Sequence, residues 1–290
     1  MKITKAVIPA AGFGTRFLPG TKAIPKEMFP IINVPTLQYI VEEAVESGIT
    51  DIMIILGKNK KVIEDHFDIS VELEEVLRKA KKFEEIEKMR KLTQMVNIVY
   101  VRQPEMNGSG GAIALSETFV GKDAFAVLFG DDLMYTDKGK EPVLKQLISA
   151  FQKYNRTVVG VQNVKREDAP KYGLIIPGKI EGRATEMLGF KEKPSIDQIP
   201  STLASMGRYV FTNQIFDEIK KAKVNVNGEI YITDAIDALI HKQGVIAYDF
   251  EGTRYDIGDH FGFLQANIEY GLRNEQLRDK ILEYIKGLVK

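Results

Sequence analysis

The sequence has no cysteine, no excess of either charge and no long apolar run. Without cysteine, the chain can form neither a disulfide framework nor a thiolate nucleophile. Its 40 basic and 40 acidic residues give a net charge of zero, which argues against nucleic acid or an anionic membrane as the main partner. No segment approaches the ~20 apolar residues that span a bilayer, and no cleavable leader is recognisable. We therefore expect a cytoplasmic protein.

The 290 residues could form one large domain or two small ones. No repeat or low-complexity linker divides the chain, so we expect a single domain over residues 1–290. Apolar runs typical of buried parallel strands alternate with helical patterns, which predicts an α/β fold with a doubly wound sheet covered on both faces. The expected strands are Lys5–Ala10, Ile52–Leu56, Ile98–Arg102, Phe125–Phe129 and Thr157–Val161, and the expected helices between them are Leu37–Glu46 and Ala112–Glu117.

Two regions depart from this alternation. Residues 70–95 are dense in charge, with apolar residues at helical spacing and acid–base pairs four residues apart. This pattern favours an amphipathic helix packed on its own domain over a lid or a partner-binding arm. We expect residues 259–290 to form a helical C-terminal region. Thr233 and Asp259 are the candidate N-caps of two late helices.

The most informative segment is the loop that follows the first strand. Gly12 and Gly14 allow the backbone to approach a ligand closely and to turn its N–H groups toward it, which suits a phosphate. Arg16 can bind phosphate oxygens with two parallel hydrogen bonds, and Lys22 and Lys26 add point charges. No acidic residue occurs before residue 27. The loop is therefore strongly positive on a neutral chain, as a polyphosphate site requires.

Two familiar phosphate-binding motifs are absent from this loop. A P-loop has four residues between its glycines and then Lys-Ser or Lys-Thr, and neither feature is present. A dinucleotide fingerprint has a third glycine where this chain has Phe17, and an acidic residue after the second strand where it has Gly57 and Lys58. The sequence therefore disfavours a hydride-transferring Rossmann enzyme.

A pair of carboxylates follows another predicted strand. Gly130, Asp131 and Asp132 come directly after Phe125–Phe129. Carboxylates beside a phosphate site favour Mg²⁺, which takes one or two protein carboxylates together with water and phosphate oxygens. A Gly-Asp-Asp triplet is also common in turns and helix caps, so the residues alone leave both interpretations open. A further carboxylate, Asp256, lies far along the chain.

Residues Gly12–Pro19 and Thr21–Met28 together resemble the signature of the sugar-nucleotide pyrophosphorylases, and most closely that of the bacterial UTP–glucose-1-phosphate uridylyltransferases. The resemblance covers nearly the whole chain. It implies a Rossmann-like, doubly wound mixed sheet of the nucleotide-diphospho-sugar transferase type. It also implies Mg²⁺-dependent transfer of a uridylyl group from UTP to glucose 1-phosphate, in a homodimer or homotetramer.

The resemblance assigns roles to individual residues. Arg16, Lys26 and Lys193 would be catalytic, and Asp131 with Asp256 would hold Mg²⁺. The nucleotide-binding residues would be Ala11, Gly12, Gly14, Thr15, Glu27, Gln103 and Gly108. The residues that bind the sugar phosphate would be Asp132, Gly173, Glu192, Lys193 and Gly207.

Gln103 has a chemical reason to face the base, because an amide can pair with both a donor and an acceptor on a uracil edge. The segment after it departs from the family pattern, since Gly111 stands where histidine is usual and Ser109 where leucine is usual. Further departures near the expected sugar site are Thr202, Tyr231 and Ile232. The alternatives are therefore a thymidylyltransferase or another sugar-1-phosphate nucleotidyltransferase, and a catalytically silent sugar-nucleotide-binding regulator.

Overall fold

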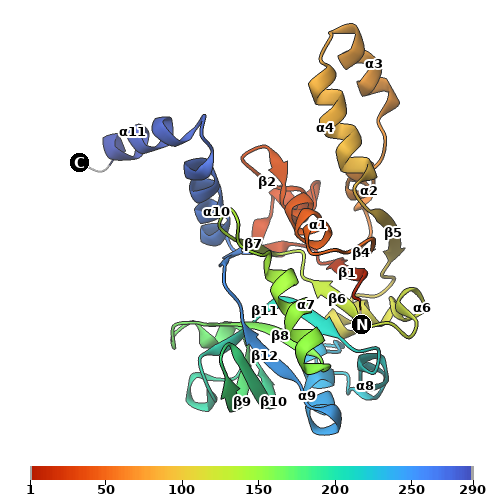
Figure 1. The fold of residues 1–290 in the computed structure, drawn as a ribbon, viewed down its shortest axis with the longest axis vertical. Coiled ribbons are helices and arrows are strands. Elements are labelled where there is room, and N and C mark those ends of the chain that lie inside the picture. Colours follow the sequence, from red (N-terminus) through yellow and green to blue (C-terminus); the bar gives the residue numbers. More distant parts are fainter. Residues whose placement is uncertain (1, 289–290) are drawn as a thin grey trace.

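The computed structural model describes residues 2–288, and its centre is a mixed sheet. Within these residues the sheet has nine strands, which are β1 (Lys5–Ala10), β4 (Asp51–Leu56), β5 (Asn97–Arg102), β6 (Phe125–Leu128), β8 (Val158–Asn163), β9 (Gly173–Glu181), β10 (Ala184–Glu192), β11 (Leu203–Phe211) and β12 (Ile246–Asp249). Their order is β5-β4-β1-β6-β11-β8-β12-β10-β9 (Figure 1). Strands β5, β4, β1 and β6 are parallel, whereas β11 is antiparallel to both of its neighbours β6 and β8.

Helices cover both faces of this sheet. The α-helices of the described residues are α1 (Thr36–Glu46), α2 (Lys61–Phe67), α3 (Val71–Lys79), α4 (Phe83–Gln94), α5 (Gly108–Ala114), α6 (Glu117–Val120), α7 (Val143–Tyr154), α8 (Ile215–Lys221), α9 (Ile232–Gln243), α10 (His260–Arg273) and α11 (Arg278–Leu288). Successive side chains of a strand point to opposite faces. Accordingly, Ile8 of β1 joins the core formed with α1 and α7, and Val7 joins the core formed with α5, α8 and α9. The predicted α/β, doubly wound mixed sheet is confirmed.

Two short strand pairs lie beside the main sheet. Strand β7 (Asp132–Tyr135) pairs antiparallel with β13 (Thr253–Asp256), and Asp132 lies opposite Asp256. The other pair is β2 (Pro30–Ile31) with β3 (Val34–Pro35). A small cluster that includes Tyr255 and Ala266 packs α10 against β7 and β13. This pairing brings two acidic segments that are distant in the sequence side by side.

The expected boundaries hold well for strands and less well for one helix. Strand β1 matches its prediction, and β4, β5 and β6 each differ from theirs by a single residue. The helix expected over Ala112–Glu117 is wrong, because α5 begins at Gly108 and ends at Ala114. The glycine-rich stretch itself forms the first turn of α5, and the Gly110 amide donates to the Ile230 carbonyl at 2.9 Å.

Residues 71–94 form a helical hairpin that projects away from the sheet (Figure 1). Arg90 of α4 donates two hydrogen bonds, of 3.1 and 2.8 Å, to the carboxylate of Glu74 in α3. Val76 and Phe83 remain more than half exposed. The prediction of a single helix is therefore wrong, since two helices pack on each other and leave apolar side chains in solvent. The end of α4 does pack on the domain, where Leu92 lies against the main core.

The C-terminal helical region is formed by α10 and α11, and its last two residues, 289–290, lie outside the described residues. Asp259 is the N-cap of α10, as predicted, and accepts from the amides of Phe261 and Gly262. Thr233 is not a cap, because α9 begins at Ile232 after Tyr231. Within the described residues, no helix has the length and apolar character needed to cross a membrane.

Candidate functional site

Two adjoining cavities lie at the carboxyl ends of β1 and β6, where ligands bind in doubly wound sheets. The first has a volume of about 450 Å³ and the second about 230 Å³. Ser109, Phe129 and Asp131 line both of them. A ligand that occupied both cavities would therefore pass beside the Asp131 carboxylate.

The first cavity brings together the residues that the sequence predicts for nucleotide binding. It is lined by Ala11, Gly12, Gly14, Thr15, Glu27, Gln103 and Gly108, and also by Lys26 and Asp131. Gly14 has a φ of 65°, in the left-handed region that glycine tolerates best. The Thr21 hydroxyl donates to the Gly14 carbonyl at 2.8 Å and so holds this turn.

Lys26 and Asp131 face each other where the two cavities meet. Lys26 Nζ donates to Asp131 Oδ2 at 2.7 Å. Burial alone would lower the pKa of Lys26, but Asp131 and Glu27 outweigh it and raise that pKa above its ordinary value. Burial alone would raise the pKa of Asp131, but the Lys26 ammonium brings that pKa below its ordinary value. Both side chains are therefore charged at neutral pH.

Lys60 supports the phosphate loop, although no sequence motif indicates it. Its ammonium, on a residue that is only 7% exposed, donates to the Ala10 carbonyl and to both carboxylate oxygens of Glu27. The Glu27 carbonyl in turn accepts from the Thr36 hydroxyl at 2.8 Å. Because its carboxylate is bound by Lys60, Glu27 shapes the first cavity through its position and its stem.

The second cavity brings together the residues predicted to bind the sugar phosphate. It is lined by Asp132, Gly173, Glu192, Lys193 and Gly207, and also by Arg16 and Asp256. Gly207 has a φ of 62°, and a Cβ at this position would lie 2.0 Å from Asp132 Oδ2. Only glycine therefore leaves the Asp132 carboxylate in its place.

Lys193 extends from a backbone conformation that is rare for lysine. Its φ is 41°, and its amide donates to the Tyr172 carbonyl at 3.0 Å. Left-handed non-glycine residues cost about 1–3 kcal/mol and concentrate at functional sites. Glu192, just before it, ends β10, and burial raises the pKa of Glu192 despite the nearby Lys193 ammonium. A strained backbone thus directs an acid and a base into the same cavity.

The pairing of β13 with β7 brings Asp256 close to Asp131. The Ile257 amide donates to the Asp131 carbonyl at 3.0 Å. The position of a Cβ on Gly258 would lie 3.2 Å from Asp256 Oδ1 and 3.4 Å from Asp131 Oδ2, so the two carboxylates converge. Arg16 Nη1 donates to the Gly258 carbonyl at 3.0 Å, which places Arg16 beside these two carboxylates. Two convergent carboxylates that can share a metal with phosphate and water suit Mg²⁺.

Metal binding here would depend on the substrate. In residues 2–288, no group of three or more His, Cys, Asp or Glu side chains could hold a metal ion. Asp131 and Asp256 would therefore supply only part of a coordination shell. That arrangement is usual for Mg²⁺, which dehydrates reluctantly and commonly takes its other ligands from phosphates and water.

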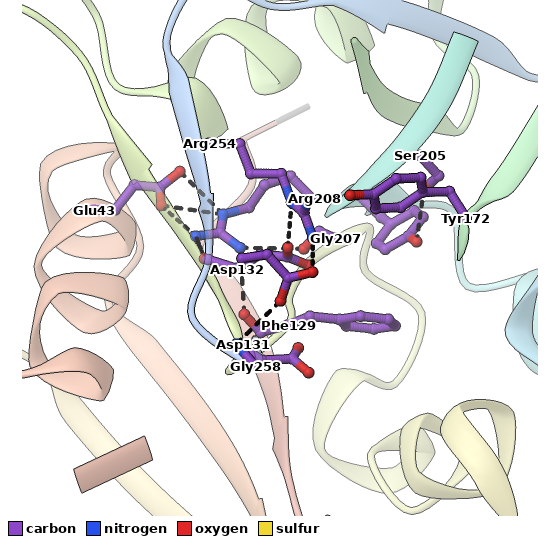
Figure 2. A network of polar contacts seen from close by, with 12 residues as sticks. Glu43, Phe129, Asp131, Asp132, Tyr172, Ser205, Gly207, Arg208, Arg254 and Gly258 are labelled. Atoms are coloured by element: carbon purple, nitrogen blue, oxygen red, sulfur yellow. Dashed lines mark hydrogen bonds and ion pairs between the residues drawn. The ribbon is translucent and has the colours of Figure 1, made fainter. Parts of the chain in front are cut away.

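Arg254 links the carboxylates of the second cavity, and the sequence reasoning did not assign it a role. Its Nε donates to Asp132 Oδ1 at 2.5 Å and its Nη1 to the Tyr172 hydroxyl at 3.1 Å (Figure 2). Its Nη2 lies 3.4 Å from Asp256 Oδ2. Burial would lower the pKa of Arg254, but Asp132 and Asp256 outweigh it and raise that pKa. The signal in the sequence was the spacing between Arg254 and Asp256, because residues two apart on a strand share a face.

A buried ion pair between Arg208 and Glu43 supports the backbone at Asp132 and Gly207 from the side of the core. Arg208, which is 0% exposed, donates from Nη2 to Glu43 Oε2 and to the Asp132 carbonyl, both at 2.7 Å, and from Nη1 to the Gly207 carbonyl at 3.2 Å (Figure 2). Glu43 also accepts from the Leu144 amide at 3.0 Å. The pair therefore ties α1, α7 and β11 to the backbone on which Asp132 and Gly207 lie.

Replacing Glu43 with glutamine is expected to lower the free energy of unfolding by about 3–5 kcal/mol, because the Arg208 cation stays buried without a counter-charge. Urea denaturation measures this change. Glu46→Gln, an exposed position on the same helix, is the matched control and should change stability by less than about 0.5 kcal/mol. If the two variants were equally stable, the buried pair would not be supporting this backbone.

Comparisons with known proteins agree with this geometry. The family model described as nucleotidyl transferase matches residues 5–271. A UTP–glucose-1-phosphate uridylyltransferase of Bacillus subtilis (strain 168) is 47% identical over 288 residues, which cover 99% of this chain and 98% of that protein. A UTP–glucose-1-phosphate uridylyltransferase 2 of Staphylococcus saprophyticus subsp. saprophyticus is 50% identical over 287 residues, with the same coverage. A crystal structure of a UDP-glucose pyrophosphorylase complexed with UDP-glucose aligns with a TM-score of 0.87 at 40% identity, and covers 94% of this chain and 100% of that one.

Proposed function

The chain belongs to the nucleotidyl transferase family, and from this premise we propose that it converts UTP and glucose 1-phosphate into UDP-glucose and diphosphate. The observation that carries the proposal is the pair of adjoining cavities that meet at Asp131. One is lined by a cationic glycine-rich loop suited to a nucleotide, and the other by paired acids and bases suited to a sugar phosphate. Relatives named for this activity align over nearly the whole chain.

The reaction needs positioning more than covalent chemistry. A phosphate oxygen of glucose 1-phosphate attacks the α-phosphorus of UTP and forms a new P–O bond. As that bond forms, the bond from the α-phosphorus to the bridging oxygen of the β-phosphate breaks, and diphosphate leaves with the electron pair. The attacking phosphate is already ionised, so the protein has to hold the two anions in line and offset their repulsion.

Three cations divide this task between the cavities. Lys26 lines the first cavity and would bind the triphosphate and then the departing diphosphate. Arg16 lines the second cavity and would help Lys26 to stabilise the triphosphate and the departing diphosphate. Lys193 lines the second cavity and would hold the attacking phosphate. Fixed charges that face the developing charge stabilise a transition state without reorganisation.

We propose that Asp131 and Asp256 are the residues that would hold Mg²⁺. When bound, Mg²⁺ would supply charge neutralisation at the phosphates. Asp132, held by Arg254, would instead accept hydrogen bonds from the sugar or ribose, and Glu192 from the sugar. Gly173 and Gly207 would let the sugar phosphate approach the backbone.

Removing divalent metal with a chelator tests this proposal. The metal-free protein should be inactive, and its activity should return when Mg²⁺ is added.

The first test is diphosphate release in the presence of Mg²⁺ and glucose 1-phosphate, with UTP, dTTP, CTP, ATP and GTP supplied separately. We expect strong release with UTP and at least tenfold less with CTP, ATP and GTP, since a lost or opposed hydrogen bond to the base costs at least this factor. Thymine presents the same hydrogen-bonding edge as uracil, so dTTP tests the ribose hydroxyl and the space at C5 instead. A preference for dTTP would favour the thymidylyltransferase alternative. No release with any triphosphate or hexose 1-phosphate would favour the silent regulator.

Assembly and location are further proposals from the family resemblance. We propose a homodimer or homotetramer in the cytoplasm, with residues 1–290 as a single nucleotidyltransferase domain and with neither nucleic acid nor membrane as a partner. Light scattering on the purified protein distinguishes these assemblies from a monomer.

A further inference from the structure

Gly111 lies within helix α5, and its backbone does not require glycine, because its φ is outside the left-handed region. Its surroundings do. A Cβ at Gly111 would lie 2.0 Å from Oδ1 and 2.4 Å from Cγ of Asn107, closer than real Cβ atoms come to a neighbour. The amide of Asn107 therefore fills the volume that a side chain at position 111 would occupy, where the family pattern usually has histidine.

The same amide is bonded to the residue expected to recognise the base. Gln103 Nε2 donates to Asn107 Oδ1 at 2.8 Å. Gln103 is only 5% exposed, lines the first cavity, and donates its backbone amide to the Leu56 carbonyl at 2.8 Å. Within the described residues, no donor is bonded to Gln103 Oε1. The amide of Gln103 is thus fixed with its nitrogen on Asn107 and its oxygen free as an acceptor.

We propose that Asn107 is a positioning residue for base specificity, which holds Gln103 in the orientation that accepts from N3–H of uracil, and that Gly111 is required because it makes room for Asn107. This inference rests on the proposed function, since it concerns the base of the same nucleotide. The inference explains why glycine stands at position 111: the Asn107 amide occupies the volume that a side chain at 111 would need.

The chemistry of the two pyrimidines explains the selectivity. Uracil presents N3–H as a donor beside carbonyl acceptors, so it can donate to Gln103 Oε1 and accept from the second hydrogen on Nε2. Cytosine presents N3 as an acceptor beside an amino donor. It would pair only if the Gln103 amide turned over, and Oε1 would then face Asn107 Oδ1, two acceptors with no hydrogen between them. With Asn107 Oδ1 facing Gln103, as in this structure, the cytosine orientation of Gln103 is therefore disfavoured. A cytosine-binding site would require both amides to turn over together.

The backbone around Asn107 is held independently of its side chain. The Asn107 carbonyl accepts from the Ile230 amide at 2.8 Å, and the Asn107 amide donates to the Glu105 carbonyl at 2.9 Å. The neighbouring Ser109 hydroxyl accepts from the Ile232 amide at 3.2 Å. Side-chain changes at Asn107 should therefore leave this segment in place, and their effects can be assigned to the amide.

The first experiment compares Asn107→Leu with Asn107→Asp, two side chains of similar size. The measured quantity is the ratio of kcat/KM for UTP to kcat/KM for CTP. Leucine removes the acceptor, so the ratio should fall about tenfold, the value of one hydrogen bond. Aspartate still accepts from Gln103 Nε2, so the ratio should stay within about threefold of the wild-type value even if its charge slows both substrates. A structural role alone would not separate these two variants.

The second experiment tests the shared space with Gly111→Ala, Asn107→Ala and the double variant. In the wild-type background, alanine at 111 displaces the Asn107 amide, so the UTP:CTP ratio should fall about as far as in Asn107→Leu. In the Asn107→Ala background, the same substitution should leave the ratio unchanged. It should also raise Tm there, because alanine favours a helix over glycine. Gly287→Ala, in α11 with open space around its Cβ position, is the control for helix propensity alone.

The outcomes separate this inference from the proposed function. If wild-type protein prefers UTP but Asn107→Leu and Gly111→Ala keep the wild-type UTP:CTP ratio, the inference is wrong and the proposed function stands. If the effect of Gly111→Ala is the same with and without Asn107, the two residues do not share a space, and the inference is also wrong. If wild-type protein neither binds nor turns over UTP, as calorimetry with UTP and CTP would reveal, the proposed function and the inference fail together.

Discussion

Replacing Lys26 with alanine is expected to lower kcat for diphosphate release by about 10²–10³-fold, the usual loss when one preorganised donor to a developing charge is removed. Lys26 is the ammonium at the meeting point of the two cavities, 2.7 Å from Asp131 Oδ2. Its raised pKa keeps it charged across the neutral range, so its contribution is present at every pH at which the enzyme would be assayed. The measurement is kcat at saturating UTP and glucose 1-phosphate.

The matched control is Lys22→Ala, in the same cationic loop. Lys22 is exposed and lines neither cavity, so its loss should change kcat by less than about threefold, since screened surface charges contribute little. Circular dichroism should give wild-type spectra for both variants. If Lys26→Ala kept a kcat within a few-fold of wild type, the role assigned to Lys26 would be wrong.

The first strand and its loop could be predicted because all their determinants are local. Lys5–Ala10 is an apolar run followed at once by glycines and cations, and strand β1 has these bounds. In a doubly wound sheet, the loop after such a strand lies at the ligand-binding edge whatever the rest of the chain does. Local sequence therefore placed Gly12, Gly14 and Lys26 in one cavity before any tertiary contact was known.

The proximity of the Asp131 and Asp256 carboxylates could not be predicted in this way. Asp131 and Asp256 are close because β13 pairs with β7 in a register that sets Asp256 opposite Asp132. Register between strands far apart in sequence depends on turns and packing across the whole fold. Only the family resemblance suggested this pair. The spacing of Arg254 to Asp256 on β13 was a local signal, but its contacts with Asp132 and Tyr172 depend on the same register and packing.

The glycine-rich stretch and the charged stretch were misread for a related reason. Glycines lower helix propensity, so the helix was predicted to begin only at Ala112, after this stretch. Residues 108–111 are helical because Gly110 and Gly111 pack against Ile230 and Asn107 more closely than any side chain would allow. Residues 71–94 carry helical periodicity without a break, yet a left-handed Lys81 reverses the chain between α3 and α4. Tertiary packing overrode the local signal at the first stretch, and one backbone conformation overrode it at the second.

Replacing Asp256 with asparagine is expected to have the second large effect, on the metal dependence of the reaction. The Mg²⁺ concentration for half-maximal diphosphate release should rise by at least about 10–100-fold, because even residues that only orient a metal ligand cost this much when they are changed. Asparagine keeps the size of the side chain and an oxygen that can accept from the Gly258 amide, as Asp256 Oδ1 does at 3.1 Å. The fold should therefore survive. The charge offered to the metal is lost, together with one of the two carboxylates that face Arg254, which keeps its pairing with Asp132.

Asp259→Asn is the matched control, the same substitution three residues along the chain. Asp259 accepts from the amides of Phe261 and Gly262 at the start of α10, and asparagine caps helices as well as aspartate does. Its Mg²⁺ titration should therefore coincide with that of the wild type. A titration of Asp256→Asn that also coincided with the wild type would remove Asp256 from the metal site and leave Asp131 as its remaining protein carboxylate. A large shift in Asp256→Asn alone would mean that strand register, rather than any local motif, assembles the metal site of this enzyme.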